Sequence, residues 1–160
     1  MVCMCLLSTY VDELATGYRR PMTDRHDLGA AFGRLTRAMV EAEEPILRRH
    51  DLEMWDYVLL SALESAAAPT QAELAATVRR DKTRIIPLLD SLEERRLLSR
   101  TPDPADRRNR IVALTDTGRA VLRDARAEIR RMEAGYLASI PAGERKVFLD
   151  VLDRLAAAAG

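Results

Sequence analysis

The sequence lacks most of the residues and patterns from which disulfide frameworks, membrane spans and catalytic sites are built. Its two cysteines, Cys3 and Cys5, cannot form a disulfide framework, and the cytoplasm is the default location. It has no apolar run of about 18 residues or more, so we expect no membrane span. Its two histidines, His26 and His50, are not accompanied by a glycine-rich phosphate loop, a nucleophile elbow or a cluster of metal ligands. We therefore expect no enzyme activity, no metal site and no cofactor.

Glycine and aromatic residues are also scarce, whereas alanine, leucine, arginine and glutamate are abundant. Seven glycines and an aromatic fraction of 4% in 160 residues favour helices over sheets. The length predicts a single domain with a sizeable core. The 25 basic and 25 acidic residues cancel, yet residues 79–110 hold ten basic and six acidic side chains. A basic segment on a neutral chain is typical of a surface that binds a polyanion.

Residues 1–21 differ from the rest of the chain, because they show no sustained hydrophobic period and end at the breaker GYRRP. A regular pattern begins after them, and Met22 is an alternative start codon. We expect residues 1–21 to be either a loose, disordered extension or upstream sequence included through a misassigned start. Residues 22–160 are expected to form the folded domain.

The regular pattern predicts four helices before the basic segment ends. Residues 24–50 form the first, in which Pro45 should cause a kink or mark the last turn, and residues 53–65 form the second. The apolar positions of the first helix recur at spacings of four and three: Leu28, Phe32, Leu35, Met39, Ala42 and Ile46. Next, a capping box at Thr70 and an N-cap at Asp81 begin two short helices. The tight turn between them predicts a helix-turn-helix.

The segments LLSR (97–100) and IVALT (111–115) are predicted to be two strands on either side of an arginine-rich loop. Thr115 is expected to cap a long helix, and Pro141 to open the last helix. The long helix has an apolar seam of Leu122, Ala125, Ile129, Met132 and Tyr136. The last helix is expected to bury Val147, Phe148, Val151, Leu152 and Leu155. The predicted fold is mainly α, a winged helix-turn-helix in which one hairpin forms the wing.

In a winged helix the second helix of the helix-turn-helix can enter the DNA major groove. Its first turn offers Lys82 for a phosphate, Thr83 for a base or phosphate, and Arg84 for a guanine edge. Arg79 and Arg80, in the turn before it, are expected to contact phosphates. The alternative is a solvated first turn, but basic residues at a helix N-terminus oppose the helix dipole, which favours a functional reason for them.

The stretch DKTRIIPLLDSLEERRLLSRTPDPADRRNRIVALTDTGRA (81–120) resembles the core of the MarR family of winged-helix transcription factors. The most specific part is D-P-x-D-R-R followed by I-V-x-L-T-x-x-G. It falls on Asp103, Pro104, Asp106, Arg107, Arg108, Ile111, Leu114, Thr115 and Gly118. The resemblance extends over about residues 24–158, because flanking helices of the right number and order surround the core.

This resemblance implies a homodimer that binds a near-palindromic site in double-stranded DNA. Residues 24–50 and 117–158 would form the dimerisation helices, and residues 53–115 the winged helix-turn-helix lobe. In the wing, Arg108 would enter the minor groove with Asp106 orienting the tip, and Arg107 and Arg110 would contact phosphates or the groove. The alternative is a surface turn with solvated arginines.

Two positions depart from the family pattern. Pro87 stands in the recognition helix, where it removes the hydrogen bond to the carbonyl of Thr83 and should make the helix bend or start late. Arg96 stands where the family usually has glycine, and would be strained by about 1 kcal/mol if the backbone there has positive φ.

Members of the family often bind small aromatic or phenolic compounds, and Phe32, His50, Met54 and Trp55 are candidates to line such a pocket. Each of the four is also explained by core or dimer packing. Oxidant sensing through Cys3 or Cys5 is weakly supported, because both lie well before the first helix and have no evident activating neighbour.

The sequence thus favours a homodimeric, sequence-specific DNA-binding regulator, most simply a ligand-responsive repressor. The alternative is a winged-helix module that contacts only proteins, and Pro87 keeps this alternative open. A DNA-binding protein should lose affinity steeply as salt rises, whereas a protein-interaction module should not.

Overall fold

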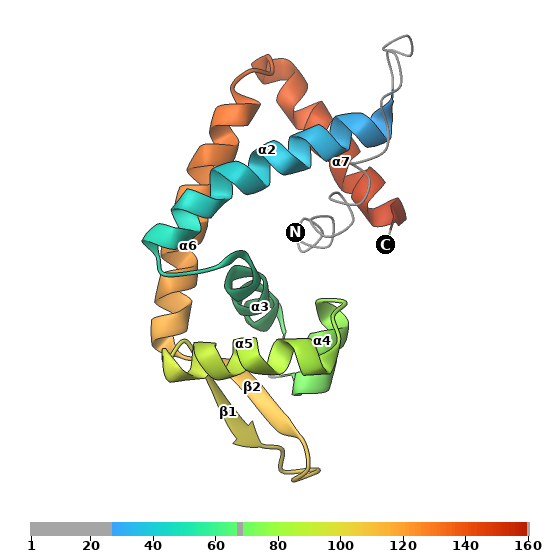
Figure 1. Cartoon of the computed structure of the whole chain (residues 1–160). Helices are drawn as coiled ribbons and strands as arrows, with labels where there is room; N and C mark the ends of the chain where they lie inside the picture. Colours follow the sequence, from blue (N-terminus) through green and yellow to red (C-terminus); the bar gives the residue numbers. More distant parts are fainter. Residues whose placement is uncertain (1–26, 67–68, 160) are drawn as a thin grey trace.

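The structure, a computed structural model, describes residues 27–66 and 69–159 (Figure 1). Its helices are α2 (Leu28–Arg49), α3 (Met54–Ser65), α4 (Gln71–Thr77), α5 (Lys82–Glu94), α6 (Asp116–Leu137) and α7 (Ala142–Ala159). The strands β1 (Leu98–Pro102) and β2 (Arg110–Leu114) form one antiparallel sheet. The predicted element order is confirmed. The predictions for residues 1–21, Met22, Cys3 and Cys5 lie outside the described residues.

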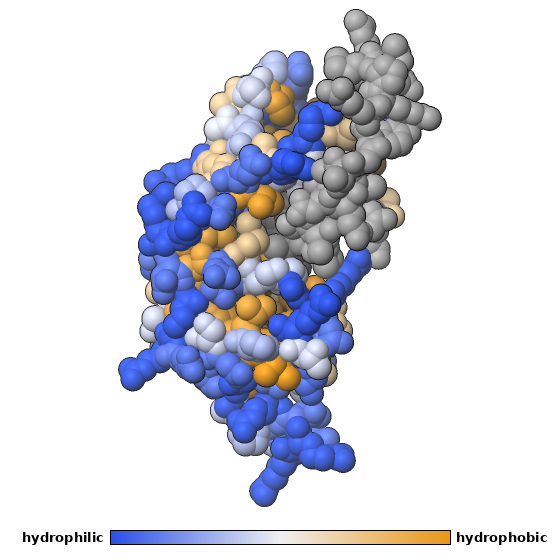
Figure 2. All heavy atoms as spheres, in the orientation of Figure 1, coloured by the Kyte–Doolittle hydropathy of each residue, from blue (hydrophilic) through white to orange (hydrophobic). Residues whose placement is uncertain are grey.

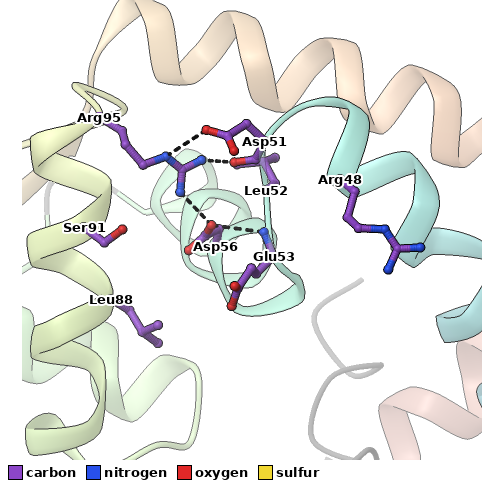
Figure 3. A pocket seen from close by; sticks show the side chains of 8 residues that line it. All are labelled: Arg48, Asp51, Leu52, Glu53, Asp56, Leu88, Ser91 and Arg95. Atoms are coloured by element: carbon purple, nitrogen blue, oxygen red, sulfur yellow. Dashed lines mark hydrogen bonds and ion pairs between the residues drawn. The ribbon is translucent and has the colours of Figure 1, made fainter.

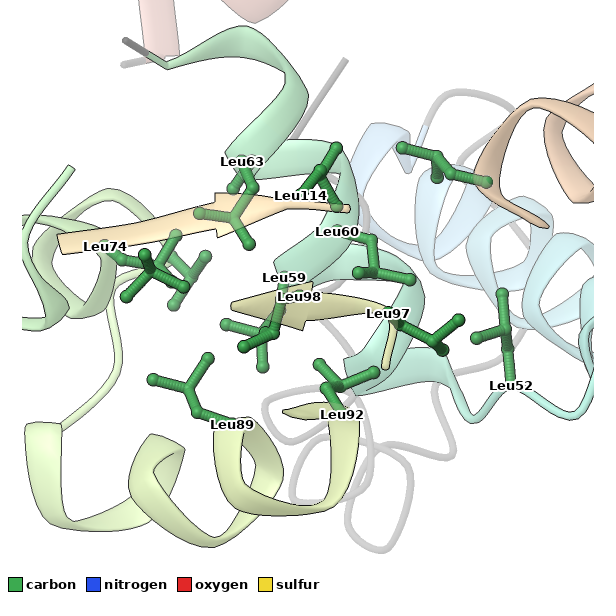
Figure 4. Packing of buried hydrophobic residues seen from close by; sticks show 14 of the residues in the cluster. Leu52, Leu59, Leu60, Leu63, Leu74, Leu89, Leu92, Leu97, Leu98 and Leu114 are labelled. Carbon is green, nitrogen blue, oxygen red and sulfur yellow. The ribbon is translucent and has the colours of Figure 1, made fainter. Parts of the chain in front are cut away.

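The core lies where the end of α2, α3, α4, α5, the hairpin and α6 meet, and Figure 4 shows part of it. It consists almost entirely of aliphatic side chains, as the leucine-rich and aromatic-poor composition requires. Its fully buried members include Leu59, Leu60, Leu74, Ile85, Leu89, Leu92, Leu98, Val112 and Leu122. Leu122, Ala125 and Ile129 carry this core into α6, so the long helix is joined to the lobe along its predicted seam.

The first residues of each element explain why the helices begin where they do. Thr70 accepts a hydrogen bond from the backbone of Glu73, whose carboxylate accepts one from the Thr70 N–H, completing the predicted capping box. Asp81 caps α5 as predicted, and Thr115 caps α6 through its hydroxyl, which accepts from the N–H of Gly118. These caps are local in sequence, so the pattern alone could predict them.

Three helices end with a non-glycine residue in the left-handed region. Asp51 after α2, Arg79 after α4 and Arg96 after α5 have φ values of 54°, 49° and 58°. The end of α5 is a Schellman motif, in which the N–H of Leu97 donates to Leu92 O (2.9 Å) and that of Arg96 to Glu93 O (2.8 Å). Arg96 therefore has the positive φ under which strain is expected at this position, and its side chain is exposed.

The hairpin is anchored to the lobe on both sides. In its register Leu98 faces Leu114 and Thr101 faces Ile111, and the N–H of Val112 donates to Pro69 O on the outer edge of β2. The hairpin then projects beyond α5, away from the long helices (Figure 1). Its base is thus fixed by the core, while its tip reaches outward.

The structure tests two expectations about prolines in helices, of which one is wrong and one is confirmed. α5 starts at Lys82 and runs unbroken through Pro87, so the late start is wrong. Pro87 is the sixth residue of the helix, and the first bonds, from the N–H groups of Arg84 and Ile85 to Asp81 O, do not involve it. α2 likewise continues for one turn beyond Pro45, which confirms that Pro45 marks the last turn.

The predicted buried face of α7 is wrong for the single chain. Val147 is 62% exposed, and Phe148, Val151 and Leu155 are exposed as well, while Leu152 is half-buried. The helix has no extensive packing partner among the described residues. None of the helices within 27–66 and 69–159 is long and apolar enough to cross a membrane.

Candidate nucleic-acid interface

The N-terminal turn of α5 presents Lys82, Thr83 and Arg84 to solvent, as predicted. Asp81 accepts hydrogen bonds from the Thr83 N–H (2.7 Å) and the Thr83 hydroxyl (2.5 Å), and these bonds lower the pKa of the Asp81 carboxyl. Because the hydroxyl proton of Thr83 is donated to Asp81, this oxygen is left as an acceptor. Lys82 and Arg84 supply the donors of the turn.

The two arginines of the preceding turn lie differently. Arg79 is exposed, in the left-handed conformation that allows α5 to follow α4 closely. Arg80 is half-buried, and its guanidinium lies over the ring of Trp55 on α3, 3.8 Å from the ring centroid. The Nε of Arg80 is buried without a hydrogen-bond partner among the described residues. Arg80 therefore has an internal role that the sequence did not predict, since it braces the turn against α3.

The tip of the wing is organised around Asp106. Its carboxylate accepts hydrogen bonds from the Arg108 N–H (3.1 Å) and the Arg108 Nε (3.1 Å), and its carbonyl accepts one from the Asn109 N–H (2.8 Å). The Arg108 guanidinium and N–H hold the pKa of Asp106 below its usual range. The side chain of Arg108 is nevertheless 91% exposed. Asp106 thus aims Arg108 outward without covering it.

The cations of the basic segment differ in their surroundings: some form ion pairs inside the protein, and others face solvent. Arg100 pairs with Asp90 (2.6 Å) and Glu93 (2.5 Å), tying β1 to α5, and the hydrogen bond from Arg100 lowers the pKa of Glu93. Seven other cations of the segment have no carboxylate within 4.0 Å in the part of the chain that the structure describes: Arg79, Arg80, Lys82, Arg84, Arg96, Arg107 and Arg110. Arg80 is stacked on Trp55 and Arg96 follows the end of α5. The other five lie, with Arg108, at the turn, the start of α5 and the wing. Figure 2 shows hydrophilic side chains covering the visible face of the wing and projecting from it.

A cavity of about 350 Å³ lies between the end of α2, the start of α3 and α5 (Figure 3). Arg95 of α5 reaches across it, donating to Asp56 (2.9 Å) and to the backbone carbonyl of Asp51. Asp56 is only 4% exposed and also accepts from the N–H of Glu53 (3.1 Å). This ion pair holds the end of α5 against α3. The sequence pattern carries no signal for it, because Arg95 and Asp56 are 39 residues apart.

The four candidate ligand residues are not gathered around a described cavity. Phe32 on α2 and Met54 and Trp55 on α3 are half-buried, and Trp55 is stacked under Arg80. His50, also half-buried, ends α2 with its Nε2 3.0 Å from a carboxylate oxygen of Glu128. Neither the cavity of Figure 3 nor a second one beside α7 is lined by any of them. The effector pocket therefore stays a prediction.

Comparisons with known proteins agree with this geometry. A profile of the MarR family matches residues 50–109. The HTH-type transcriptional repressor NicR of Pseudomonas putida is 30% identical over 134 residues, which cover 81% of this chain and 85% of NicR. These relatives are transcription regulators, which confirms that the chain is not an enzyme.

Two solved structures of the repressor CouR share the fold. One, bound to a 23-mer DNA duplex, is 28% identical with a TM-score of 0.74, and the match covers 87% of this chain and 99% of that one. The other, from Rhodococcus jostii RHA1 and bound to p-coumaroyl-CoA, is 32% identical with a TM-score of 0.68, covering 86% and 96%. The chain has a helix-turn-helix with an arginine-tipped wing, and it shares its long helices with these relatives. It is therefore a winged-helix transcriptional regulator of the MarR family.

Proposed function

We propose that the protein is a homodimeric repressor that binds a near-palindromic DNA site and responds to a small effector. The observation that carries this proposal is Arg108, 91% exposed at the tip of a hairpin whose base is fixed in the core and aimed by Asp106. A lone guanidinium on a thin support is suited to the narrow, strongly negative minor groove of A·T-rich DNA.

Each outward cation has a role that follows from its place. Lys82 and Arg79 flank the start of α5 and contact phosphates, while Arg84 pairs with a guanine edge in the major groove. Arg107 and Arg110 contact phosphates on either side of the wing. Thr83 accepts a hydrogen bond from a base amine, since its own proton is held by Asp81.

We propose that the long helices, in residues 24–50 and 117–158, form the dimer interface. Residues 53–115 form the DNA-binding lobe. The exposed apolar face of α7 supports this division, because an amphipathic helix of 18 residues without a packing partner has little stability of its own. Leu28 and Leu35 add exposed apolar surface on α2. A second copy of the chain covers both surfaces.

Dimer formation is tested by Phe148→Ala. We expect the dimer dissociation constant to rise at least about tenfold, because each protomer loses an aromatic side chain from the interface. Sedimentation equilibrium measures the constant, with Lys146→Ala as the control, since Lys146 is 85% exposed on the same helix. Equal constants for the two variants would rule out α7 as the interface.

The effector is proposed to be a small aromatic or phenolic compound. The CouR structure bound to p-coumaroyl-CoA supports this class, and Phe32, His50, Met54 and Trp55 are the proposed contacts. A ring that stacks on the face of Trp55 covered by Arg80 would displace the guanidinium. Effector binding would then release the brace between α3 and the turn before α5, and DNA affinity would fall.

DNA binding is tested with the wild-type protein and the Arg108→Ala variant on DNA from upstream of its own gene, or on sites selected from genomic DNA. We expect the variant to lose about 1–3 kcal/mol of affinity with dimerisation intact, and the slope of log K against log salt to become shallower. Fluorescence anisotropy at several salt concentrations measures both quantities.

Arg123→Ala is the matched control, because Arg123 is an exposed arginine on α6 that is not among the proposed DNA contacts. Unchanged affinity of Arg108→Ala would reduce the wing tip to a solvated loop. A wild-type protein without salt-dependent affinity for any of this DNA would favour the alternative, a winged helix that contacts only proteins.

A further inference from the structure

The solvent-exposed face of α5 carries an apolar residue, Pro87, between its polar residues. Ile85, Leu89 and Leu92 point into the core, and the exposed residues of the helix are Lys82, Thr83, Arg84, Pro87, Asp90, Ser91 and Glu94. Pro87 lies one turn after Thr83 and Arg84, so it shares their face of the helix. It is the one exposed residue of α5 with no polar side-chain group.

Pro87 restricts which base can lie opposite it. Its ring offers only CH₂ groups, and it has no backbone N–H to donate. Guanine, adenine and cytosine present hydrogen-bonding groups in the major groove that would be desolvated against this ring without a partner. Thymine alone adds a methyl group, and contact between this methyl and an apolar side chain is favourable.

The charges around Pro87 allow DNA to approach it. Arg84 lies on the turn before it and is unpaired among the described residues. Asp90, on the turn after it, shares the Arg100 guanidinium with Glu93, at 2.6 Å and 2.5 Å. This pairing weakens the repulsion between the Asp90 carboxylate and the phosphates of a DNA that approaches this face of α5.

We propose that Pro87 is a specificity-determining residue that reads the methyl group of one thymine in each half-site of the operator. This inference rests on the proposed DNA-binding function and adds to it a base identity. Arg84 selects for guanine by hydrogen bonding, whereas Pro87 selects for thymine by apolar contact and by excluding bases whose polar edges it cannot satisfy.

Thymine-to-deoxyuridine scanning of the operator tests the proposal, because this exchange removes only the methyl group. Each thymine of the selected operator is replaced singly, and the affinity of the full-length protein is measured by anisotropy at fixed salt. We expect one thymine in each half-site at which the exchange weakens wild-type binding about fourfold, the contribution of one buried methyl-sized group.

Pro87→Ser should bind the thymine and deoxyuridine operators equally at that position. Pro45→Ser is the matched control, since Pro45 is also an exposed proline within a helix but lies on α2, outside the lobe. The control should keep the fourfold difference. Circular dichroism melting verifies that the variants fold.

The outcomes separate the two claims. Specific binding with no methyl-sensitive thymine overturns the role of Pro87 and leaves the DNA-binding function standing, even if Pro87→Ser does not fold. A methyl-sensitive thymine whose effect persists in a folded Pro87→Ser protein also overturns it. Absence of any specific DNA binding by the wild-type protein removes the proposed function, and the inference with it.

Discussion

Gly118→Ala is expected to destabilise the protein by about 3 kcal/mol or more, because there is no room for a β-carbon at this position. A Cβ built on Gly118 would lie 1.8 Å from the backbone carbonyl oxygen of Leu97. The obstacle is backbone, so it cannot move aside as a flexible side chain would. The first turn of α6 or the loop before β1 has to shift.

Such a shift breaks the junction between α6 and the lobe. The Leu97 carbonyl accepts from the Thr115 N–H (3.2 Å), and the Thr115 hydroxyl donates to Arg96 O (2.6 Å) while capping α6. These bonds hold the start of α6 against the end of α5. We therefore expect operator affinity to fall along with stability, since α6 joins the lobe to the proposed dimerisation helices.

Gly135→Ala is the control for this prediction. Gly135 lies on the same helix, and a Cβ there meets nothing within 4 Å. Alanine in its place should be neutral or stabilising by up to about 1 kcal/mol, because glycine is a poor helix former. Urea unfolding of both variants gives the comparison, and equal stabilities would contradict the close approach at Gly118.

Glu43→Gln is expected to stabilise the protein by about 3 kcal/mol at pH 8 and to have little effect at pH 4. Glu43 on α2 is 3% exposed, where α2 packs against α6. Burial, and secondarily the charge of Glu133, raises its pKa from 4.5 to about 7. Burial also raises the pKa of Glu133.

The direction of this pH dependence follows from the number of protons that the folded and unfolded chains bind. Between about pH 4.5 and 7 the unfolded chain loses the Glu43 proton while the folded chain keeps it, so the free energy of unfolding of the wild type falls as pH rises. Above pH 7 the loss is complete. Glutamine resembles the protonated carboxyl and removes the contribution of Glu43 to this slope, while Glu133, whose pKa is also raised, keeps a contribution of the same sign. Glu41→Gln, an exposed carboxylate on the same helix, should leave it unchanged.

Unfolding at fixed protein concentration from pH 4 to 8 measures the effect, because dimer formation would otherwise change the apparent stability. A slope as steep in Glu43→Gln as in the wild type would show that Glu43 is not the group that titrates in this range. A wild-type profile that is flat between pH 4.5 and 7 would contradict the raised pKa itself.

Most of the fold could be predicted because its determinants are local. The caps at Thr70, Asp81 and Thr115 and the apolar stripe of α5 each lie within a few residues of the helix they define. The prediction for α7 failed because an apolar stripe indicates that a face is covered and does not indicate by what. In the single chain the face is open, and the described residues provide no cover.

The site was predicted less completely, because its internal partners come from distant parts of the chain. Asp106 and Arg108 are two residues apart, and the wing motif predicted their contact. Arg80 and Trp55, or Arg95 and Asp56, meet only through packing of α3 against the turn and α5. The basic segment could be identified from the sequence. Which of its arginines form ion pairs within the protein and which face solvent could not be predicted from the sequence.

The uneven distribution of charge along the neutral chain affects how the protein approaches DNA. Residues 79–110, which contain the turn, α5 and the wing, hold ten basic and six acidic side chains, whereas acidic side chains outnumber basic ones in the rest of the chain. The molecule is therefore an electric dipole rather than a uniformly positive body. In the field of a DNA duplex such a dipole turns its basic end toward the phosphates before contact, so fewer encounters occur in the wrong orientation. With no net charge, it is also less prone than a basic protein to be retained by other polyanions during the search.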